Sequence, residues 1–241
     1  MIMTAGCSAA DKLSDEIELQ IEKTAEFLSE QIPNPQVASV GGEWTVKGLK
    51  SSGAYEDEKY FDRYYDNVRA IVKSQDGKLH ERYYTEYARV TIGLCAIGKD
   101  PRNVEGYDLT APLDDYDMIT AQGPNAAAYA LTAANTAGVT LKNQDRYIEY
   151  LISEIDKGDV KEDRFYSDYI SMALLGLSFY ADREEVKEAI ERYTDMLSEM
   201  QDENGSLGSC ESDAEAVMAL SQLGIDVTGD DRFVKKVGSF V

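Results

Sequence analysis

The chain has 241 residues, of which 43% are hydrophobic, and its formal net charge at pH 7 is −21. This length and composition allow one large domain with a substantial core. The strong negative charge argues against binding to nucleic acids or to anionic membrane surfaces, because both need basic patches. No stretch approaches the roughly 20 apolar residues of a transmembrane helix.

The first seven residues, MIMTAGC, resemble the end of a bacterial lipoprotein signal peptide. Ala5-Gly6-Cys7 follows apolar residues and precedes a polar segment, although Thr4 stands where such signals usually carry Leu, and their charged and apolar regions are missing. On this interpretation residues 1–13 are a signal remnant or lipoprotein linker, and Cys7 carries lipid. An ordinary N-terminal segment is the alternative.

The folded domain is expected over residues 14–241, and it begins with an amphipathic helix over Ser14–Ile32 whose N-cap is Ser14. A second helix is predicted over Glu43–Gly53. A helix with one apolar face follows over Asp57–Ser74, where apolar residues recur three or four positions apart.

A helix of small and apolar residues is predicted over Thr85–Asp100, TEYARVTIGLCAIGKD. Its pattern recurs in Glu211–Asp226, ESDAEAVMALSQLGID, and again in Ala126–Gly138 and Tyr166–Tyr180. Small or apolar residues three and four apart, closed by a Gly, are expected of a short buried helix with a glycine cap. Together with Glu43–Gly53, the five copies follow one another at intervals of 40 to 45 residues.

The segments between these copies are more polar. Pro101–Gly123 is irregular with one short helix expected, whereas Asn143–Asp156 and Glu184–Met200 are predicted amphipathic helices, and Asp230–Val241 begins another. A period of roughly 20–50 residues indicates stacked supersecondary units. Buried helices that alternate with one-faced helices favour an inner ring wrapped by an outer ring. We therefore predict an all-α toroid, incomplete at its C-terminus, with an open solenoid as the alternative.

One turn carries a resemblance to a known superfamily. Gln201-x-x-x-Gly205-x-Leu207 resembles the Gln-x-x-x-Gly-x-Trp turn of the α/α toroids, and Gln75-x-Gly77-x-Leu79 is a shortened form. This superfamily includes squalene and terpene cyclases, protein prenyltransferase β subunits and cobalamin carriers of the transcobalamin type.

A longer stretch is most similar to bacterial surface proteins of the prenyltransferase-like or squalene-oxidase-repeat kind. The similarity rests on Thr85–Leu109, Gly42-Glu43-Trp44 and Gly123-Pro124-Asn125, and it covers about residues 44–233. The resemblance implies a toroid outside the cytoplasm. It implies little about activity, because one fold hosts many functions.

The catalytic motifs of that superfamily are missing from the sequence. Asp-x-Asp-Asp does not occur, and Asp114-Asp115-Tyr116-Asp117 is one residue short of the magnesium-binding Asp-Asp-x-x-Asp. A prenyltransferase zinc site needs Asp, Cys and His. The sole histidine, His80, lies by a turn, and the aspartate expected two residues before Cys210 is replaced by Gly208. His80 would also have to be the base of any nucleophilic pair, and no Gly-x-Ser-x-Gly accompanies it. We therefore expect no metal and no cofactor.

Acidic residues at or near the N-terminal ends of the small and apolar helices are weak catalytic candidates. Glycosidases work with two carboxylates at a defined separation, which would suit an enzyme acting on a glycan or an isoprenoid. Compensation of the helix dipole is the alternative, since acids are favoured in the first turn. The candidates are Glu86, Asp168, Glu211 and Asp213.

In a toroid the N-terminal ends of the inner helices converge on one face, where aromatic and polar side chains would form a ligand site. Arg89 is unusual because other copies carry Tyr129, Met172 and Glu215 at its position, so it pairs with Glu86 or holds an anionic group. Packing of the tyrosines between the rings is the alternative. The candidate ligand-binding residues are Trp44, Tyr83, Tyr84, Glu86, Tyr87, Arg89, Asn125, Tyr129, Asp168 and Tyr169.

These features predict a non-catalytic module outside the cytoplasm that binds a bulky small molecule or a surface partner. Membrane attachment would be through the N-terminal lipid only. The alternatives are an enzyme acting on an isoprenoid or glycan through carboxylates at the mouth of the toroid, and a purely structural surface module.

Overall fold

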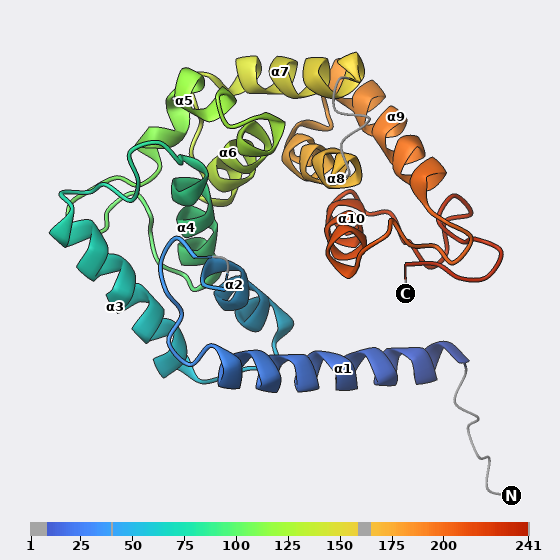
Figure 1. Ribbon diagram of the computed structural model, residues 1–241, viewed down its shortest axis with the longest axis horizontal. Helices are drawn as coiled ribbons and strands as arrows, with labels where there is room; N and C mark the ends of the chain where they lie inside the picture. The colour runs from blue at the N-terminus through green and yellow to red at the C-terminus, as the bar shows by residue number, and fades with distance from the viewer. Residues whose placement is uncertain (1–8, 40, 159–164, 241) are drawn as a thin grey trace, which may run out of the picture. The chain divides into compact units, whose positions relative to one another are not determined.

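The computed structural model describes residues 9–39, 41–158 and 165–240. Within these ranges the chain forms α-helices and two short 3-10 helices, with one isolated bridge and no strand (Figure 1). The predicted all-α class is therefore confirmed. Cys7 lies outside the described residues, so its lipidation stays a prediction.

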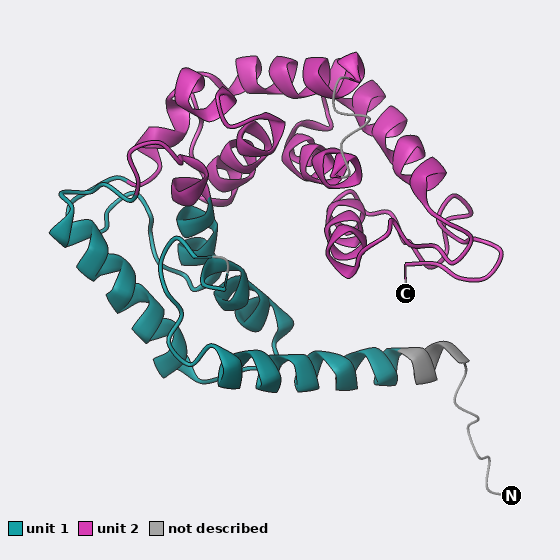
Figure 2. Cartoon of the chain, in the orientation of Figure 1, with its two compact units in different colours: residues 1–79, 89–108 teal, residues 80–88, 109–241 magenta. Residues whose placement is uncertain are grey.

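The chain divides into two compact units (Figure 2). The first contains residues 1–79 and 89–108, and the second contains residues 80–88 and 109–241. The chain passes from one unit to the other within α4 (Thr85–Ala96).

The first unit contains α1 (Ala9–Gln31), α2 (Glu43–Ser52), α3 (Glu58–Ser74) and the part of α4 from Arg89 onward. The prediction that Ser14 caps the first helix is wrong, because α1 begins at Ala9. Residues 9–13, AADKL, are rich in good helix formers, so the helix extends past the serine.

The core of the first unit depends on the apolar face of α3. The sequence predicted one apolar face on this helix, and the structure buries that face, with Tyr60 and Tyr64 in it and Tyr65 only half-buried. Asp57 caps the helix by accepting a hydrogen bond from the amide of Lys59. The buried residues of α3 are Tyr60, Phe61, Tyr64, Val68 and Val72.

The second unit contains η1 (Ala111–Asp114), α5 (Tyr116–Thr120), α6 (Pro124–Thr136), α7 (Gln144–Lys157), α8 (Tyr166–Leu177), η2 (Ser178–Tyr180), α9 (Glu184–Met200) and α10 (Cys210–Gln222). Helix α8 packs against both α6 and α10. Most residues of α6 and α8 are buried, whereas α7 and α9 bury one face. A Cβ atom at Gly176 of α8 would lie 2.9 Å from the carbonyl oxygen of Ala128 of α6, so a small residue there permits close packing.

The turn before α10 gives a physical reason for the Gln-x-x-x-Gly pattern. The buried side chain of Gln201 donates a hydrogen bond to the carbonyl of Gly205 over 2.6 Å. Gly205 has φ +90°, and a Cβ atom there would lie 2.6 Å from the backbone of Ser239. Both the backbone angle and this close approach favour glycine.

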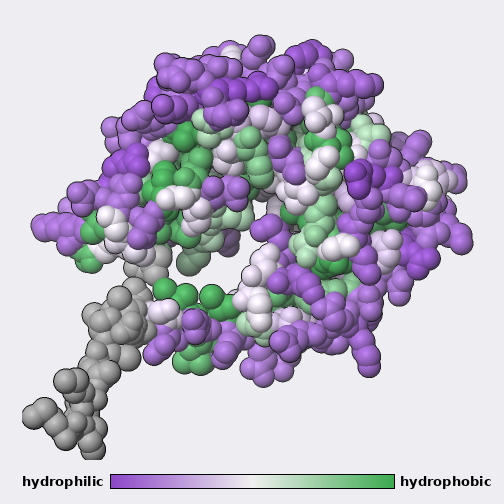
Figure 3. Space-filling view, turned by 180° about the vertical axis from the view of Figure 1, so that it is seen from behind, coloured by the Kyte–Doolittle hydropathy of each residue, from purple (hydrophilic) through white to green (hydrophobic). Residues whose placement is uncertain are grey.

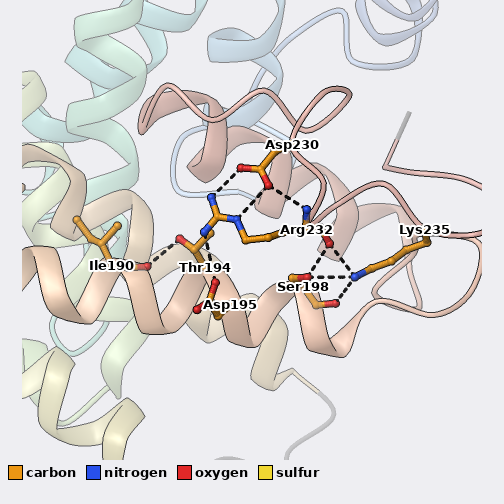
Figure 4. A network of polar contacts seen from close by, with 7 residues as sticks. All are labelled: Ile190, Thr194, Asp195, Ser198, Asp230, Arg232 and Lys235. Atoms are coloured by element: carbon orange, nitrogen blue, oxygen red, sulfur yellow. Dashed lines mark hydrogen bonds and ion pairs between the residues drawn. The ribbon is translucent and has the colours of Figure 1, made fainter.

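The predicted helix over Asp230–Val241 is wrong, because residues 230–240 form turns and irregular backbone. Asp230 accepts hydrogen bonds from both the amide and the guanidinium of Arg232. The carbonyl of Arg232 accepts hydrogen bonds from Ser198 of α9 and from Lys235 (Figure 4). These side-chain bonds replace the backbone bonds that a helix would make.

Candidate functional site

A pocket of about 440 Å³ opens in the second unit between the N-terminal ends of α8 and α10. The turn that precedes α10 forms another part of its wall. The pocket combines two carboxylates, two hydroxyls and two apolar side chains. These are Asp168 and Glu211, Ser209 and Ser212, and Phe165 and Leu207.

The local structure of this wall is fixed by caps. Ser209 is the N-cap of α10 and accepts a hydrogen bond from the amide of Ser212. Asp213 accepts hydrogen bonds from the amide of Leu207 over 2.6 Å and from the hydroxyl of Ser206 over 2.9 Å. The carboxylate of Asp213, a predicted catalytic candidate, therefore anchors the turn beside the pocket.

A third carboxylate, Glu215, lies close enough to Asp168 to feel its charge, although it does not line the pocket. Glu215 follows Glu211 by four residues, so both lie on the same face of α10. Burial raises the pKa of Glu215 to about 7, and the negative charge of Asp168 on α8 adds to the increase. The Oε2 atom of Glu215 is buried and has no hydrogen-bond partner among the described residues. The site thus favours an added positive charge.

The predicted candidates are divided between the two units. Trp44 and Arg89 belong to the first unit, and the other candidates belong to the second. Asp168 and Glu211 line the same pocket, as expected of acids at helix N-termini. Convergence of the whole set on one opening stays a prediction. The remaining candidates of the second unit are Tyr83, Tyr84, Glu86, Tyr87, Asn125, Tyr129, Tyr169 and Asp213.

Several residues just before and at the start of α4 contact one another, and Thr85 also bonds to Gln122. His80 accepts hydrogen bonds at Nδ1 from the amides of Arg82 and Tyr83, and its ring lies 4.5 Å from the ring of Tyr83. Tyr84 packs edge-to-face on Tyr87 with ring centroids 5.4 Å apart. The side chain of Tyr87 is buried, which agrees with the packing alternative for that residue.

A buried carboxylate in the first unit was not predicted as part of a site. Glu43 is 1% exposed, and its Oε1 atom accepts hydrogen bonds from the amide of Ala38 over 2.7 Å and from the hydroxyl of Tyr64 over 3.1 Å. Burial raises the pKa of Glu43, and the positive charge of Arg89 opposes the increase. Arg89 therefore has a buried carboxylate beside it.

Two acids that the sequence placed in a loop accept hydrogen bonds from backbone amides. Asp114 accepts hydrogen bonds from the amides of Lys142 and Asn143, and Asp115 caps α5 by accepting from the amide of Met118. In the part of the chain that the structure describes, no group of three or more His, Cys, Asp or Glu could hold a metal ion. Among the same residues no helix has the length and apolarity needed to cross a membrane.

Two important residues were not predicted as site residues, although the repeat contains a signal for each. Glu215 and Glu43 are both charged, and each lies in a copy of the repeat, which is made mostly of small and apolar residues. A charge in such a helix indicates either a partner or a perturbed pKa. The hydroxyl and apolar parts of the pocket, Ser209, Ser212 and Phe165, have no comparable signal.

Comparisons with known proteins leave the family open. No protein-family model matches the chain, and no solved structure matches it. Over 145 residues the chain is 30% identical to the uncharacterized protein CG3556 of Drosophila melanogaster. The match covers 59% of this chain and 23% of that protein, so the matched part spans less than a quarter of the relative's length.

Proposed function

We propose that this chain is a ligand-binding module and that the pocket between α8 and α10 binds an organic cation with a primary ammonium group. The observation that carries the proposal is the group of three carboxylates, Asp168, Glu211 and Glu215. Glu215 holds a proton near neutral pH because its own burial and the charge of Asp168 disfavour a further negative charge. The positive charge of a bound ammonium group would offset the negative charges of Asp168 and an ionised Glu215.

The other walls of the pocket also suit such a ligand. An ammonium group has three N–H donors and no acceptor, so it matches carboxylate and serine oxygens. Phe165 is 44% exposed at the pocket, and an aromatic face attracts cations as well as alkyl chains. The net charge of −21 favours the approach of a cation. A volume of about 440 Å³ lies within the range of small-molecule sites, roughly 300–1,000 Å³.

Calorimetric titration with 1,5-diaminopentane and with 1,5-pentanediol separates a cation site from a general polar site. We expect the diamine to bind and the neutral diol to bind at least tenfold more weakly. Asp168→Asn should weaken diamine binding by roughly ten- to 150-fold, since a charge-assisted hydrogen bond is worth about 1.5–3 kcal/mol. Glu188→Gln is the control, because Glu188 is an exposed carboxylate of α9 outside the pocket lining. Equal binding of diamine and diol would contradict the proposal.

One observation favours a second function, acid–base catalysis on a glycan. A carboxylic acid with a pKa of about 7 beside another carboxylate is the arrangement that a general acid requires. Under this alternative, Glu215→Gln would abolish release of reducing ends from an oligosaccharide panel, whereas Glu188→Gln would not. If the wild type releases no reducing ends, the catalytic alternative is wrong. The binding function is then tested by the calorimetric titration alone.

We also propose that the helical hairpins wrap into an α/α toroid. The alternation of largely buried helices (α6, α8) with one-faced helices (α7, α9) supports it. Small-angle scattering tests the shape, since a compact chain of this length has a radius of gyration of about 18 Å. A value well above this would favour the open solenoid.

The location of the chain is part of the same proposal. We propose a site outside the cytoplasm with a lipid on Cys7, supported by the sequence Ala5-Gly6-Cys7. Metabolic labelling with an alkyne fatty acid in a bacterial host should mark the wild type and not Cys7→Ser. Equal labelling of both would refute the lipid anchor.

A further inference from the structure

A second cavity, in the first unit, is a groove of about 460 Å³ between α1 and α2. Its wall is mostly apolar, unlike the carboxylate pocket of the second unit. The residues that shape it are Ile17, Ile21, Ala25 and Leu28 of α1 and Gly48 and Leu49 of α2.

The α1 side of this groove is poorly covered. Every side chain from residue 14 to residue 24 is exposed, including Ile17 at 37% and Ile21 at 39%. Hydrophobic surface is visible along α1 in the space-filling view (Figure 3). Exposed apolar side chains that form one continuous surface mark an interaction site more often than scattered ones do.

The groove has the shape that another helix requires. Ile17, Ile21 and Leu28 recur at helical spacing, and the stretch from 17 to 28 extends over about 16 Å at the helical rise of 1.5 Å per residue. On the opposite wall, no heavy atom lies within 4 Å of a Cβ atom built at Gly48. A helix can therefore place its side chains against this wall, as in known helix-in-groove complexes.

Charge identifies the occupant. Between residues 14 and 31, α1 carries six acidic residues and a single basic residue, Lys23. On α2, Lys50 forms an ion pair with Glu58 over 2.6 Å, and it does not line the groove. A second copy of this chain would bring an equally acidic α1 and a net charge of −21, which repulsion disfavours.

We propose that the groove between α1 and α2 binds a cationic amphipathic helix of a partner protein. The apolar face of the partner helix lies against Ile17, Ile21 and Leu28, and its lysines or arginines face the acidic edge of α1. This surface belongs to the first unit, so it is independent of the carboxylate pocket.

Fluorescence anisotropy on the full chain tests this proposal with a labelled 18-residue helix of leucine and lysine arranged on opposite faces. A peptide with glutamate in place of lysine is its matched control. We expect the lysine peptide to bind at least tenfold more tightly than the glutamate peptide. Raising the salt from 50 to 500 mM should weaken lysine-peptide binding by at least fivefold, because exposed charges are screened.

Two variants of α1 locate the binding site. Ile21→Ser should weaken lysine-peptide binding about tenfold, whereas Leu19→Ser should change it less than twofold. Leu19 is 47% exposed on the same helix but does not line the groove, so the two substitutions are matched in exposure. Circular dichroism checks that both variants keep their helix content.

Three results would overturn the proposal. The first is absence of lysine-peptide binding, and the second is an equal loss of binding in both serine variants. The third is a dimer in sedimentation velocity that Ile21→Ser dissociates, since this would assign the groove to a second copy of the chain.

Discussion

Glu215→Gln should make the protein more stable above neutral pH, although it removes a charged residue. Burial and the charge of Asp168 raise the pKa of Glu215 from 4.5 to about 7. Between pH 4.5 and about pH 7, the Glu215 carboxyl is protonated in the folded chain and ionised in the unfolded chain. The stability that this protonation contributes is full below pH 4.5 and is lost as the pH rises through 7. Glutamine stays neutral throughout and avoids the loss.

The size of the effect follows from the pKa change. A shift of about 2.5 pH units at 1.36 kcal/mol per unit sets an upper limit of about 3 kcal/mol. Glu215 is only half-buried, so solvent screening reduces the expected gain to about 1–2 kcal/mol. For a chain of this size that corresponds to a rise in the unfolding temperature of about 2–8 °C.

Urea unfolding of wild type and Glu215→Gln at pH 4.5, 6 and 8 measures the effect. The two proteins should have nearly equal free energies of unfolding at pH 4.5 and should diverge by pH 8. Glu211→Gln, an exposed carboxylate one turn earlier, should change stability by less than about 0.5 kcal/mol. If Glu215→Gln retained the full pH dependence of the wild type, the reasoning about its burial would be refuted.

Two further substitutions test the local structure, each by urea unfolding. Gly205→Ala should cost more than 2 kcal/mol, because it adds backbone strain and brings a methyl group against the backbone of Ser239. Gly208→Ala has similar backbone strain but open space, so about 1 kcal/mol is expected, and equal costs would count against the contact. Glu43→Ala should cost about 2–3 kcal/mol by leaving the buried Tyr64 hydroxyl without its acceptor, whereas Glu43→Gln keeps an acceptor and should cost under 1 kcal/mol. Similar costs for both would contradict that role of Glu43.

The helices themselves could be predicted from the sequence because their signals are local. Apolar residues at helical spacing located α3 and α9, and runs of small residues located α6, α8 and α10. The error at the C-terminus has a non-local cause. The carbonyl of Arg232 accepts a hydrogen bond from Ser198, which is 34 residues earlier in the chain. No local pattern reports such a bond.

The candidate site was predicted in part for the same reason. Asp168 and Glu211 occupy first turns of helices in a repeat, so their shared pocket follows from the repeat itself. The raised pKa of Glu215 depends on how deeply α10 buries it and on the charge that α8 brings near. Both depend on packing, which the sequence pattern does not specify.

The most direct test of the central claim is proton release when a diamine binds. Titrating 1,5-diaminopentane at pH 6.5 in two buffers with different ionisation enthalpies gives the number of protons exchanged. An ammonium group near Asp168 and Glu215 favours the charged carboxylate of Glu215 and lowers its pKa from about 7, so up to about three-quarters of a proton should be released. Glu215→Gln should bind the diamine without this release. No binding by the wild type, or the same proton release in both proteins, would contradict an ammonium site between α8 and α10.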